Sequence, residues 1–443
     1  MRLIIENIAK VRSADIKLDG LTVIAGENSS GKSTVGKILF STIKALADAK
    51  DDDANAREKI VNKHVNSLYM RLRGILRRYE NKELDLLFPL PQRAFTRTLV
   101  EAESSNGLEE YLKKLSTAID NIVEATPRLK ALLHRDLDNI AINLRNKDNR
   151  AATLKTIMEY SIESEFMNSI CSYGHSEAYV KFRMDNSGDE DFLTLHITNE
   201  EVNSVRVGSG RPIADATYVE SPLYLHMLDT LLNADTFREG SSRMLRRSML
   251  PVHIKDLAEK IDSLRLSSPE PFLISQLNIQ DIIDGEFHYD IKKRSLSFRQ
   301  NSKEISPINV ASGIKTFGLI QMLLETNTIS PDKILIWDEP ENHLHPQWQI
   351  LFAKLLVQLS KMGIPVVVST HSPYFVQGVR FFAAQLDLEP FVNYYLAEDG
   401  DDCLAVLRNV TDDLNSIFIK LSKPLNEIMN VDLARKKRED KND

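Results

Sequence analysis

The sequence predicts an α/β protein whose mixed β-sheet core is interrupted by an inserted helical region. β-branched, strand-like segments occur near both ends of the chain, and a Gly-rich turn near the N-terminus runs into an amphipathic helix. Two apolar runs, 334–337 and 364–369, enclose a helical segment, which is typical of strands buried on both faces of a sheet. Because 443 residues are too many for one ordinary core, we expect two or three folding units.

The predicted elements fall into five consecutive segments. Residues 1–48 hold the strand-like stretches "RLIIE", "VRSADIKL" and "LTVIAG" and then the amphipathic helix. Charged residues at helical spacing dominate a helical insertion, 49–175, after which strand patterning returns over 176–221. A second helical stretch, the helical lobe, covers 222–284. The last segment, 285–443, starts with a hairpin-like pair and contains the apolar β-α-β unit.

The composition excludes several classes of protein. With 42% hydrophobic residues, 27% charged residues and a net charge of −7, the chain as a whole is not a polycation that coats nucleic acid. Cys171 and Cys403 belong to no CxxC pair, so a disulfide framework and a structural zinc site lack support. The start "MRLIIENIAK" has no apolar signal region, and no stretch approaches the length of a membrane span. We therefore expect a cytoplasmic protein with no membrane partner.

The stretch "GENSSGKS" matches the phosphate-binding pattern G-x-x-x-x-G-K-[ST] between a predicted strand and a predicted helix. Gly26 and Gly31 allow a tight turn whose N–H groups converge on phosphate oxygens. Lys32 is placed to reach the β- and γ-phosphates, and the Ser33 hydroxyl to bind Mg²⁺. The predicted nucleotide-binding residues of this P-loop are Gly26, Glu27, Asn28, Ser29, Ser30, Gly31, Lys32, Ser33 and Thr34.

Acidic residues follow the first apolar run, in "ILIWDEPENHLHP". Asp338 ends the predicted strand, where its carboxylate can bind Mg²⁺, and Glu339 is placed to act as general base on an attacking water. The next strand, "IPVVVSTHSP", ends at His371, a donor for the γ-phosphate. Because ligands collect at the carboxyl ends of parallel strands, these residues and Lys32 are predicted to share one crevice. The predicted catalytic residues are thus Lys32, Glu339 and His371, and the predicted magnesium ligands are Ser33 and Asp338.

A transition-metal site is the competing interpretation of this acidic stretch. His343 and His345 stand two positions apart, which gives them a common face only in a strand. They follow a strand, however, and precede Pro346, a residue suited to the first turn of a helix. We therefore favour a Walker B strand that serves a nucleotide over a zinc site, and expect the two histidines to pack in a turn or an interface.

With Lys32, "ILIWDEP" and "STHSP" in this order, the chain resembles ABC-type ATPases of the SMC, Rad50, RecF and OLD lineage. It is most similar to the bacterial AAA group (AAA_15/AAA_21-like) that carries "DEPE-x-x-LHP" and "THSP" and occurs in anti-phage defence systems, such as Septu-like and PARIS-like ATPase subunits. The likeness covers roughly 1–48 and 285–380, plus "YVESP" at 218–222. It implies an ABC/SMC-like ATPase head with ATP and Mg²⁺ as cofactors.

Members of this lineage donate a signature helix, L-S-x-G-E/Q, to the γ-phosphate held by a partner copy. In "NVASGIKTFG", Ser312 and Gly313 match its small core, but Ala311 and Ile314 replace the usual Ser and Glu/Gln. One hydroxyl contact is lost unless Ser312 or Lys315 takes over. The resemblance implies a homodimer or higher homo-oligomer formed through an ATP sandwich, and the altered signature predicts slow hydrolysis. The family's Q-loop glutamine has no clear match, and Glu220 lies near that place.

The insertion and the basic clusters leave the partners open. Gly74, Pro89, Pro91, Gly107 and Pro127 interrupt the insertion, which favours a compact helical unit over a long coiled coil. Too few residues follow the "THSP" motif for a Toprim nuclease domain, and "AEDGDDC" is typical of a hairpin turn. Nucleic-acid contact and a solvated surface stay equally open for three basic clusters: Arg71, Arg73, Arg77, Arg78; Arg243, Arg246, Arg247; and Lys292, Lys293, Arg294.

Two function classes follow from these observations. The first is an ATP-hydrolysing, dimerising switch that senses phage or nucleic acid and controls a separate effector nuclease in a bacterial defence system. The second is a scaffold that hydrolyses ATP weakly and holds a partner, which the altered signature favours. A RecF-like repair ATPase also stays open, whereas the large insertion and the poor signature disfavour a transporter cassette.

Overall fold

The computed structural model describes most of the chain in two compact units. The described residues are 1–49, 61, 65, 68, 72, 87–88, 95, 98–99, 102, 107–122, 126–145, 150–167, 169–183, 191–208, 213–232, 250–265, 277–290, 295–301, 303–400 and 402–423. One unit comprises Met1–Lys44 and Glu159–Asp443, and the other comprises Ala45–Met158. Among the described helices, none is long and apolar enough to cross a membrane.

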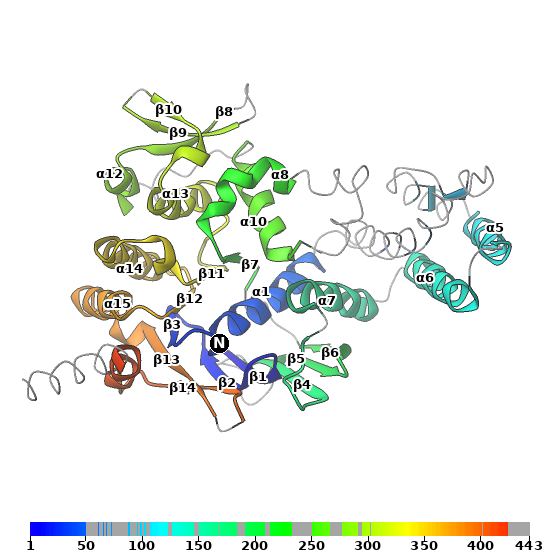
Figure 1. Ribbon diagram of the computed structural model, residues 1–443, viewed down its shortest axis with the longest axis horizontal. Helices are drawn as coiled ribbons and strands as arrows, with labels where there is room; N and C mark the ends of the chain where they lie inside the picture. Colours follow the sequence, from blue (N-terminus) through cyan, green and yellow to red (C-terminus); the bar gives the residue numbers. More distant parts are fainter. Residues whose placement is uncertain are drawn as a thin grey trace, which may run out of the picture. The chain divides into compact units, whose positions relative to one another are not determined.

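An 11-stranded mixed sheet forms the core of the first unit, in the order β6-β5-β4-β1-β2-β14-β13-β3-β12-β11-β7 (Figure 1). The run β7-β11-β12-β3-β13 is parallel, whereas β1, β2, β4, β5 and β6 form antiparallel pairs. The strands are β1 (Arg2–Ile8), β2 (Val11–Lys17), β3 (Leu21–Gly26), β4 (Glu177–Arg183), β5 (Asp191–Thr198), β6 (Glu201–Val207), β7 (Asp215–Val219), β11 (Lys333–Asp338), β12 (Val366–Thr370), β13 (Val392–Asp399) and β14 (Ala405–Asn409). The mixed α/β fold that the sequence predicts is therefore confirmed.

Helices and a small second sheet complete the first unit. The second sheet has the order β10-β9-β8, with β8 (Glu286–Asp290), β9 (Ser295–Gln300) and β10 (Lys303–Ile305). The α-helices are α1 (Lys32–Asp48), α8 (Leu228–Leu232), α10 (Val252–Asp262), α12 (Ile279–Ile283), α13 (Ser312–Glu325), α14 (Pro346–Lys361) and α15 (Pro373–Gln385). The 3-10 helices are η1 (Pro222–Met227), η2 (Ser263–Arg265), η3 (Pro307–Asn309), η4 (Pro340–His343) and η5 (Glu389–Phe391).

Side chains of β11 alternate between two buried layers, as the period of a strand requires. Trp337 packs edge-on against Phe352 of α14, with ring centroids 5.0 Å apart. Ile336 points to the opposite face, where a Cβ on Gly36 of α1 would approach its Cγ2 to 3.2 Å. Helices α14 and α15 thus cover one face of the parallel strands and α1 covers the other (Figure 1). Burial on both faces explains why the four residues 334–337 of β11 are all apolar.

The parallel register brings three chain turns to one edge of the sheet. Strand β12 pairs with β3 on one side and with β11 on the other, and all three run in the same direction. The P-loop follows β3, Asp338 ends β11 and Thr370 ends β12. The fold therefore places these three positions together although more than 300 residues of chain separate the first from the second.

The second unit has a hydrophobic core of its own. It contains α5 (Leu108–Asp120) and α6 (Pro127–Arg145), and α7 (Arg150–Phe166) begins in it. Apolar side chains of α5 and α6, such as Leu115 and Leu133, are fully buried in one cluster with residues between Val61 and Leu99. The predicted insertion, 49–175, begins close to this unit and extends beyond it.

Two predictions about strands have clear outcomes. The hairpin around "AEDGDDC" is confirmed, because β13 and β14 pair antiparallel on either side of that segment. Strand β6 lies within the predicted strand segment, 176–221, although only Val202 among its residues is buried. The predicted basic clusters at 71–78, 243–247 and 292–294, and the breaks at Gly74, Pro89 and Pro91, lie outside the described residues.

Candidate nucleotide-binding and hydrolysis site

The P-loop has a backbone that only glycine accommodates at two positions. Gly31 has φ +83°, and a Cβ there would lie 2.9 Å from Cγ2 of Val11. A Cβ on Gly26 would lie 2.7 Å from Oγ of Ser30. Contacts under 3.0 Å force a rearrangement, so a side chain at either position would displace the loop. Both glycines of the motif are therefore needed for the shape of the loop.

The loop leads into the first turn of α1, where polar groups are left to bind a ligand. Helix α1 begins at Lys32, and Ser33 and Thr34 lie half-buried in its first turn. The first N–H groups of a helix have no partner within it and favour a negative charge. Ser30 Oγ is buried and has no hydrogen-bond partner among the described residues. Unpartnered donors around a tight glycine turn fit a polyphosphate, so the residues present suit ATP.

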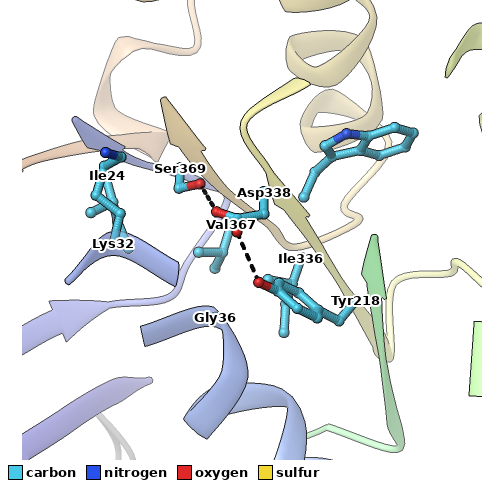
Figure 2. Close-up of a pocket in the computed structure, with 9 residues that line it drawn as sticks. Ile24, Lys32, Gly36, Tyr218, Ile336, Asp338, Val367 and Ser369 are labelled. Atoms are coloured by element: carbon cyan, nitrogen blue, oxygen red, sulfur yellow. Dashed lines mark hydrogen bonds between the residues drawn. The ribbon is translucent and has the colours of Figure 1, made fainter. Parts of the chain in front are cut away.

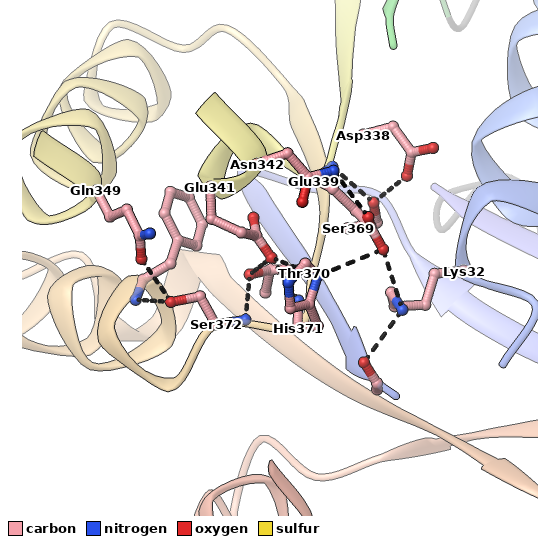
Figure 3. A network of polar contacts seen from close by, with 12 residues as sticks. Lys32, Asp338, Glu339, Glu341, Asn342, Gln349, Ser369, Thr370, His371 and Ser372 are labelled. Carbon is pink, nitrogen blue, oxygen red and sulfur yellow. Dashed lines mark hydrogen bonds and ion pairs between the residues drawn. The ribbon is translucent and has the colours of Figure 1, made fainter. Parts of the chain in front are cut away.

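The ammonium of Lys32 lies at the centre of the site. The residue is only 3% exposed, and its Nζ donates hydrogen bonds to the carbonyl oxygens of Gly26 (3.1 Å) and Glu27 (2.7 Å). Nζ also lies 3.3 Å from Oε1 of Glu339. Figure 3 shows these contacts linking the P-loop to the end of β11. The structure therefore brings two sequence-predicted residues into direct contact.

Asp338 is held through both of its carboxylate oxygens (Figure 2). Tyr218 donates a hydrogen bond of 3.0 Å to Oδ2, and the Ser369 hydroxyl donates one to Oδ1. Asp338, Tyr218 and Ser369 line a small pocket together with Lys32 and Gly36. Burial raises the pKa of Tyr218 well above its usual range, so its hydroxyl remains a donor.

Magnesium fits this pocket through the chemistry of its donors. Mg²⁺ prefers a few carboxylate and hydroxyl oxygens together with waters and phosphate oxygens. Asp338 lines the pocket and supplies a carboxylate, whereas the other expected ligand, Ser33, follows Lys32 in the sequence and is not among the residues that line the pocket. Within the described part of the chain, no group of three or more His, Cys, Asp or Glu side chains has the arrangement of a metal site. The donor set therefore suits an ion that phosphates help to hold.

Glu339 occupies a strained backbone position directly after β11. Its φ is +45°, in the left-handed region, and its N–H donates to the carbonyl oxygen of Ser369 (3.1 Å). Asn342 donates a hydrogen bond of 3.0 Å to Oε2. The nearby imidazole of His371 is the main cause that lowers the pKa of Glu339 to about 2, and Asn342 and Lys32 add to it. The Glu339 carboxylate is therefore ionised at neutral pH.

His371 joins Glu339 from the end of β12. Its Nδ1 lies 3.6 Å from Oε1 of Glu339 and 3.2 Å from Oε1 of Glu341, without the alignment of a hydrogen bond. The two carboxylates raise the pKa of His371, with Glu339 as the largest cause. Lys32, Glu339 and His371, which come from three separate stretches of sequence, thus form one contact group (Figure 3).

The predicted signature residues lie at the start of α13. Ser312 is the first residue of that helix, and its N-cap residue Ala311 provides no side-chain cap. A Cβ on Gly313 would lie 2.9 Å from Cε3 of Trp348, so close packing against the indole requires glycine there. Among the described residues, no hydrogen bond or ion pair joins Ser312 or Gly313 to Lys32 or Glu339. The polar contacts of Ser312 in the described part of the chain are thus within its own helix, to Thr316.

The other two histidines of the acidic stretch, His343 and His345, and the Q-loop candidate Glu220 lie in structural positions away from the P-loop contacts. His345 caps α14, since its Nδ1 accepts a hydrogen bond of 3.3 Å from the N–H of Gln347. His343 ends η4. Glu220 lies 3.1 Å from Nε2 of His253 and accepts a hydrogen bond of 2.7 Å from Tyr224. None of these contacts involves the P-loop.

Four polar neighbours in the site were not predicted from the sequence: Tyr218, Glu341, Asn342 and Ser369. Glu341 and Asn342 stand within the "DEPENHLHP" stretch, whose Glu339 defines the motif, so their position was visible although their contacts were not. Tyr218 and Ser369 reach Asp338 across strand pairs, and nothing in their local sequence indicates that.

Comparisons with known proteins agree with this geometry. The AAA_21 family, described as "AAA domain, putative AbiEii toxin, Type IV TA system", matches residues 185–377, which include Asp338, Glu339 and His371. A curated relative, "Retron Vc95 probable ATPase" from Vibrio cholerae serotype O1 biovar El Tor, is 21% identical over 369 residues. That alignment covers 80% of this chain and 66% of the relative, so the chain spans just under two thirds of that protein's length.

Solved structures of SMC heads are also similar to this chain. The SMC head bound to the C-winged helix domain of ScpA has a TM-score of 0.37 at 11% identity, over 92% of this chain and 96% of that one. The SMC head domain from Thermotoga maritima has a TM-score of 0.34 at 12% identity, over 92% and 98%. The family match and the ordered motifs thus make residues 185–377 of this chain similar to ATPases of the AAA_21 group.

Proposed function

We propose that this protein binds and hydrolyses ATP and uses the cycle as a dimerising switch. The observation that carries the proposal is the contact of Glu339 Oε1 with both Lys32 Nζ (3.3 Å) and His371 Nδ1 (3.6 Å). Phosphoryl transfer needs a lysine that binds phosphate, a carboxylate that orients the attacking water and a hydrogen-bond donor to the γ-phosphate. Here the three candidate groups are in contact.

Each residue would then have a distinct task. Lys32 exchanges its contacts with the loop carbonyls and Glu339 for the β- and γ-phosphates. Glu339, released from the ammonium, accepts a hydrogen bond from the attacking water and then its proton. His371, whose pKa is raised, donates to the γ-phosphate. Mg²⁺ held by Ser33 and Asp338 would offset the negative charge of the phosphate oxygens.

A second copy of the chain would complete the site. Ser312 and Gly313 start a helix, and a helix start attracts phosphate, yet they make no contact with Lys32 of their own chain. Two chains arranged head to tail would each present α13 to the nucleotide of the other. Binding of ATP would then hold the dimer closed, and hydrolysis would release it.

The biological role that we propose is the ATPase subunit of an anti-phage defence system. The similarity to a retron ATPase supports this, as does the AAA_21 match. By the resemblance to defence ATPases, a separate effector nuclease, controlled by the ATP state, would carry out the destructive step. Phage products or nucleic acid would act as the trigger.

The altered signature favours a second candidate, an ATP-bound scaffold with weak hydrolysis. Ala311 stands where the resemblance places a Ser, so one hydroxyl contact to the trans γ-phosphate is missing. In that case the closed dimer would persist and hold a partner rather than cycle.

Light scattering on purified variants tests the switch. Glu339→Gln should double its mass when ATP and Mg²⁺ are added, because ATP still binds but the general base is gone. Losing a general base costs about 10²–10⁴ in rate, so this variant should hydrolyse almost no ATP. Lys32→Ala is the control and should remain at the mass of the nucleotide-free protein. A constant mass above that of the monomer for both variants would contradict the switch and support the scaffold.

A further inference from the structure

Glu341 is a buried carboxylate that none of the roles above uses. The residue is 6% exposed and lies in η4, two residues after Glu339. Burial raises its pKa, and its Oε2 has no hydrogen-bond partner among the described residues. Burying a carboxylate with one oxygen unpaired is unfavourable. We therefore looked to the contacts of the other carboxylate oxygen, Oε1, for the reason that a glutamate is buried here.

The other oxygen, Oε1, contacts three groups of the turn that follows β12. It accepts a hydrogen bond of 2.7 Å from the Thr370 hydroxyl and one of 2.5 Å from the N–H of His371. It also lies 3.2 Å from Nδ1 of His371. One carboxylate oxygen thus accepts a hydrogen bond from the backbone of His371 and lies within ion-pair distance of its ring (Figure 3).

A closed set of hydrogen bonds holds this arrangement together. The N–H of Ser372 donates to the Thr370 hydroxyl (3.0 Å), and the Ser372 hydroxyl donates to Oε1 of Gln349 (2.6 Å). Gln349 in turn donates to the carbonyl oxygen of Leu344, one residue after η4 (2.9 Å). The chain that carries Glu341 and the turn that carries His371 are therefore tied to each other at both ends.

Charged groups face His371 from three elements. Glu339, after β11, and Glu341, on η4, favour the protonated imidazole, whereas Lys32, on α1, opposes it. The opposite ring nitrogen, Nε2, has no hydrogen-bond partner within the described part of the chain. The carboxylates thus occupy one edge of the ring and leave the other edge for a ligand.

We infer that Glu341 is a positioning residue for His371: it holds Nδ1 against the two carboxylates so that Nε2 is presented to a phosphate. This inference rests on the proposed role of His371 toward the γ-phosphate. Glu341 does not touch the substrate in this scheme and acts only through the imidazole. When ionised, its carboxylate also favours the protonated ring, which suits the negative charge that the ring would meet.

The first test measures the imidazole of His371 directly by NMR titration in nucleotide-free protein, with His371→Gln to assign its resonance. Glu341→Gln keeps an acceptor oxygen for Thr370 and for the His371 N–H but removes the charge. The pKa of His371 should fall by about one pH unit, because an opposite charge within about 4–6 Å shifts a pKa by about 1–3. Glu325→Gln, a half-buried glutamate on α13, is the matched control and should leave this titration unchanged.

The second test is the pH profile of ATP hydrolysis. If hydrolysis requires a protonated His371, the rate decreases at alkaline pH as the ring loses its proton. Glu341→Gln should therefore shift this decrease to lower pH. The affinity for ATP should change little, since Lys32 and the P-loop are untouched. In a His371→Gln background, Glu341→Gln should have no further effect, because residues that act through one another are not additive.

Glu341→Asp keeps the inference testable if the Gln variant does not fold. The shorter side chain keeps the charge but withdraws the oxygen from the turn, so kcat should fall by about 10²-fold, the cost of misplacement by about 1 Å. An unchanged His371 pKa in Glu341→Gln, or additive effects of the two substitutions, would overturn the inference. The NMR titration needs no ATP, so its result is independent of whether ATP drives the dimer.

Discussion

At the scale of single residues, charge compensation organises the site. Glu339 lies within contact distance of an ammonium and of an imidazole, and its pKa is lowered to about 2, so its carboxylate is ionised at neutral pH. Asp338 instead receives two neutral hydroxyl donors, from Tyr218 and Ser369. The charge of Glu339 is thus balanced by side chains that can move to a bound nucleotide. Asp338 is instead oriented by neutral hydroxyl groups of the sheet.

The hydroxyl of Tyr218 should therefore affect the use of magnesium. Tyr218→Phe keeps the ring but removes a hydrogen bond to Asp338, an interaction that contributes about 1 kcal/mol. The concentration of Mg²⁺ needed for half-maximal hydrolysis should rise by about fivefold, while binding of ATP without Mg²⁺ stays the same. Tyr179→Phe, whose hydroxyl contacts Glu177 on β4, is the control. Equal magnesium curves for Tyr218→Phe and wild type would rule out this role.

At the scale of elements, a buried histidine joins α7, α10 and β7. His253 is fully buried, with Nδ1 2.7 Å from Oε2 of Glu165 and Nε2 3.1 Å from Oε2 of Glu220. Its ring also packs edge-on against Tyr218, with centroids 4.7 Å apart. Burial alone would lower the pKa of His253, but its two carboxylate neighbours outweigh that and raise it. The same tyrosine that orients Asp338 thus rests on this ion cluster.

This cluster predicts a pH-dependent part of the stability. The pKa of His253 is higher in the folded than in the unfolded protein, so its contribution is complete below about pH 6.5 and is lost as pH rises through the raised value. Glu165→Gln should lower the free energy of unfolding by about 1–2 kcal/mol more at pH 6 than at pH 9. Urea unfolding at the two pH values measures this. Glu177→Gln, an exposed glutamate 4.0 Å from His196, should show no such difference.

What the sequence could predict follows the same division between local and distant contacts. The glycine turn at Gly31 is a local feature, and so is the apolar strand around Ile336 that ends in acidic residues and a turn. Their residue types alone therefore indicated a P-loop and a Walker B strand. The contact of Tyr218 with Asp338 and that of Glu341 with Thr370 cross between elements that are far apart in the chain. No local pattern encodes such contacts, because they depend on how the strands are ordered in the sheet.

At the scale of the whole molecule, the proposed dimer depends on α13 acting in trans. Lys315, on the first turn of that helix, is 3% exposed, and burial lowers its pKa. Its Nζ lies 3.2 Å from Nδ1 of His226 and has no carboxylate partner among the described residues. A buried ammonium without a counter-ion suits an anion supplied by another chain.

Mixing two inactive variants tests this arrangement. Lys32→Ala lacks its own phosphate lysine, and Lys315→Met lacks the cation on α13, so neither should hydrolyse ATP at the wild-type rate. A mixed dimer contains one site with both groups intact, and the mixture should therefore recover hydrolysis that neither variant shows alone. A mixture no more active than the sum of its parts would show that Lys315 does not act across the dimer.

The order of strands in the large sheet has a consequence for synthesis of the protein. Strand β3, which precedes the P-loop, pairs with β12 on one side and β13 on the other, and these neighbours end at Thr370 and Asp399. A nascent chain therefore carries the complete GENSSGKS sequence from the start but has no flanking strands to shape it until residue 399 has left the ribosome. Pairings so distant in sequence form late and slowly. We therefore expect nucleotide binding to begin only after β12 and β13 have been synthesised and have paired with β3.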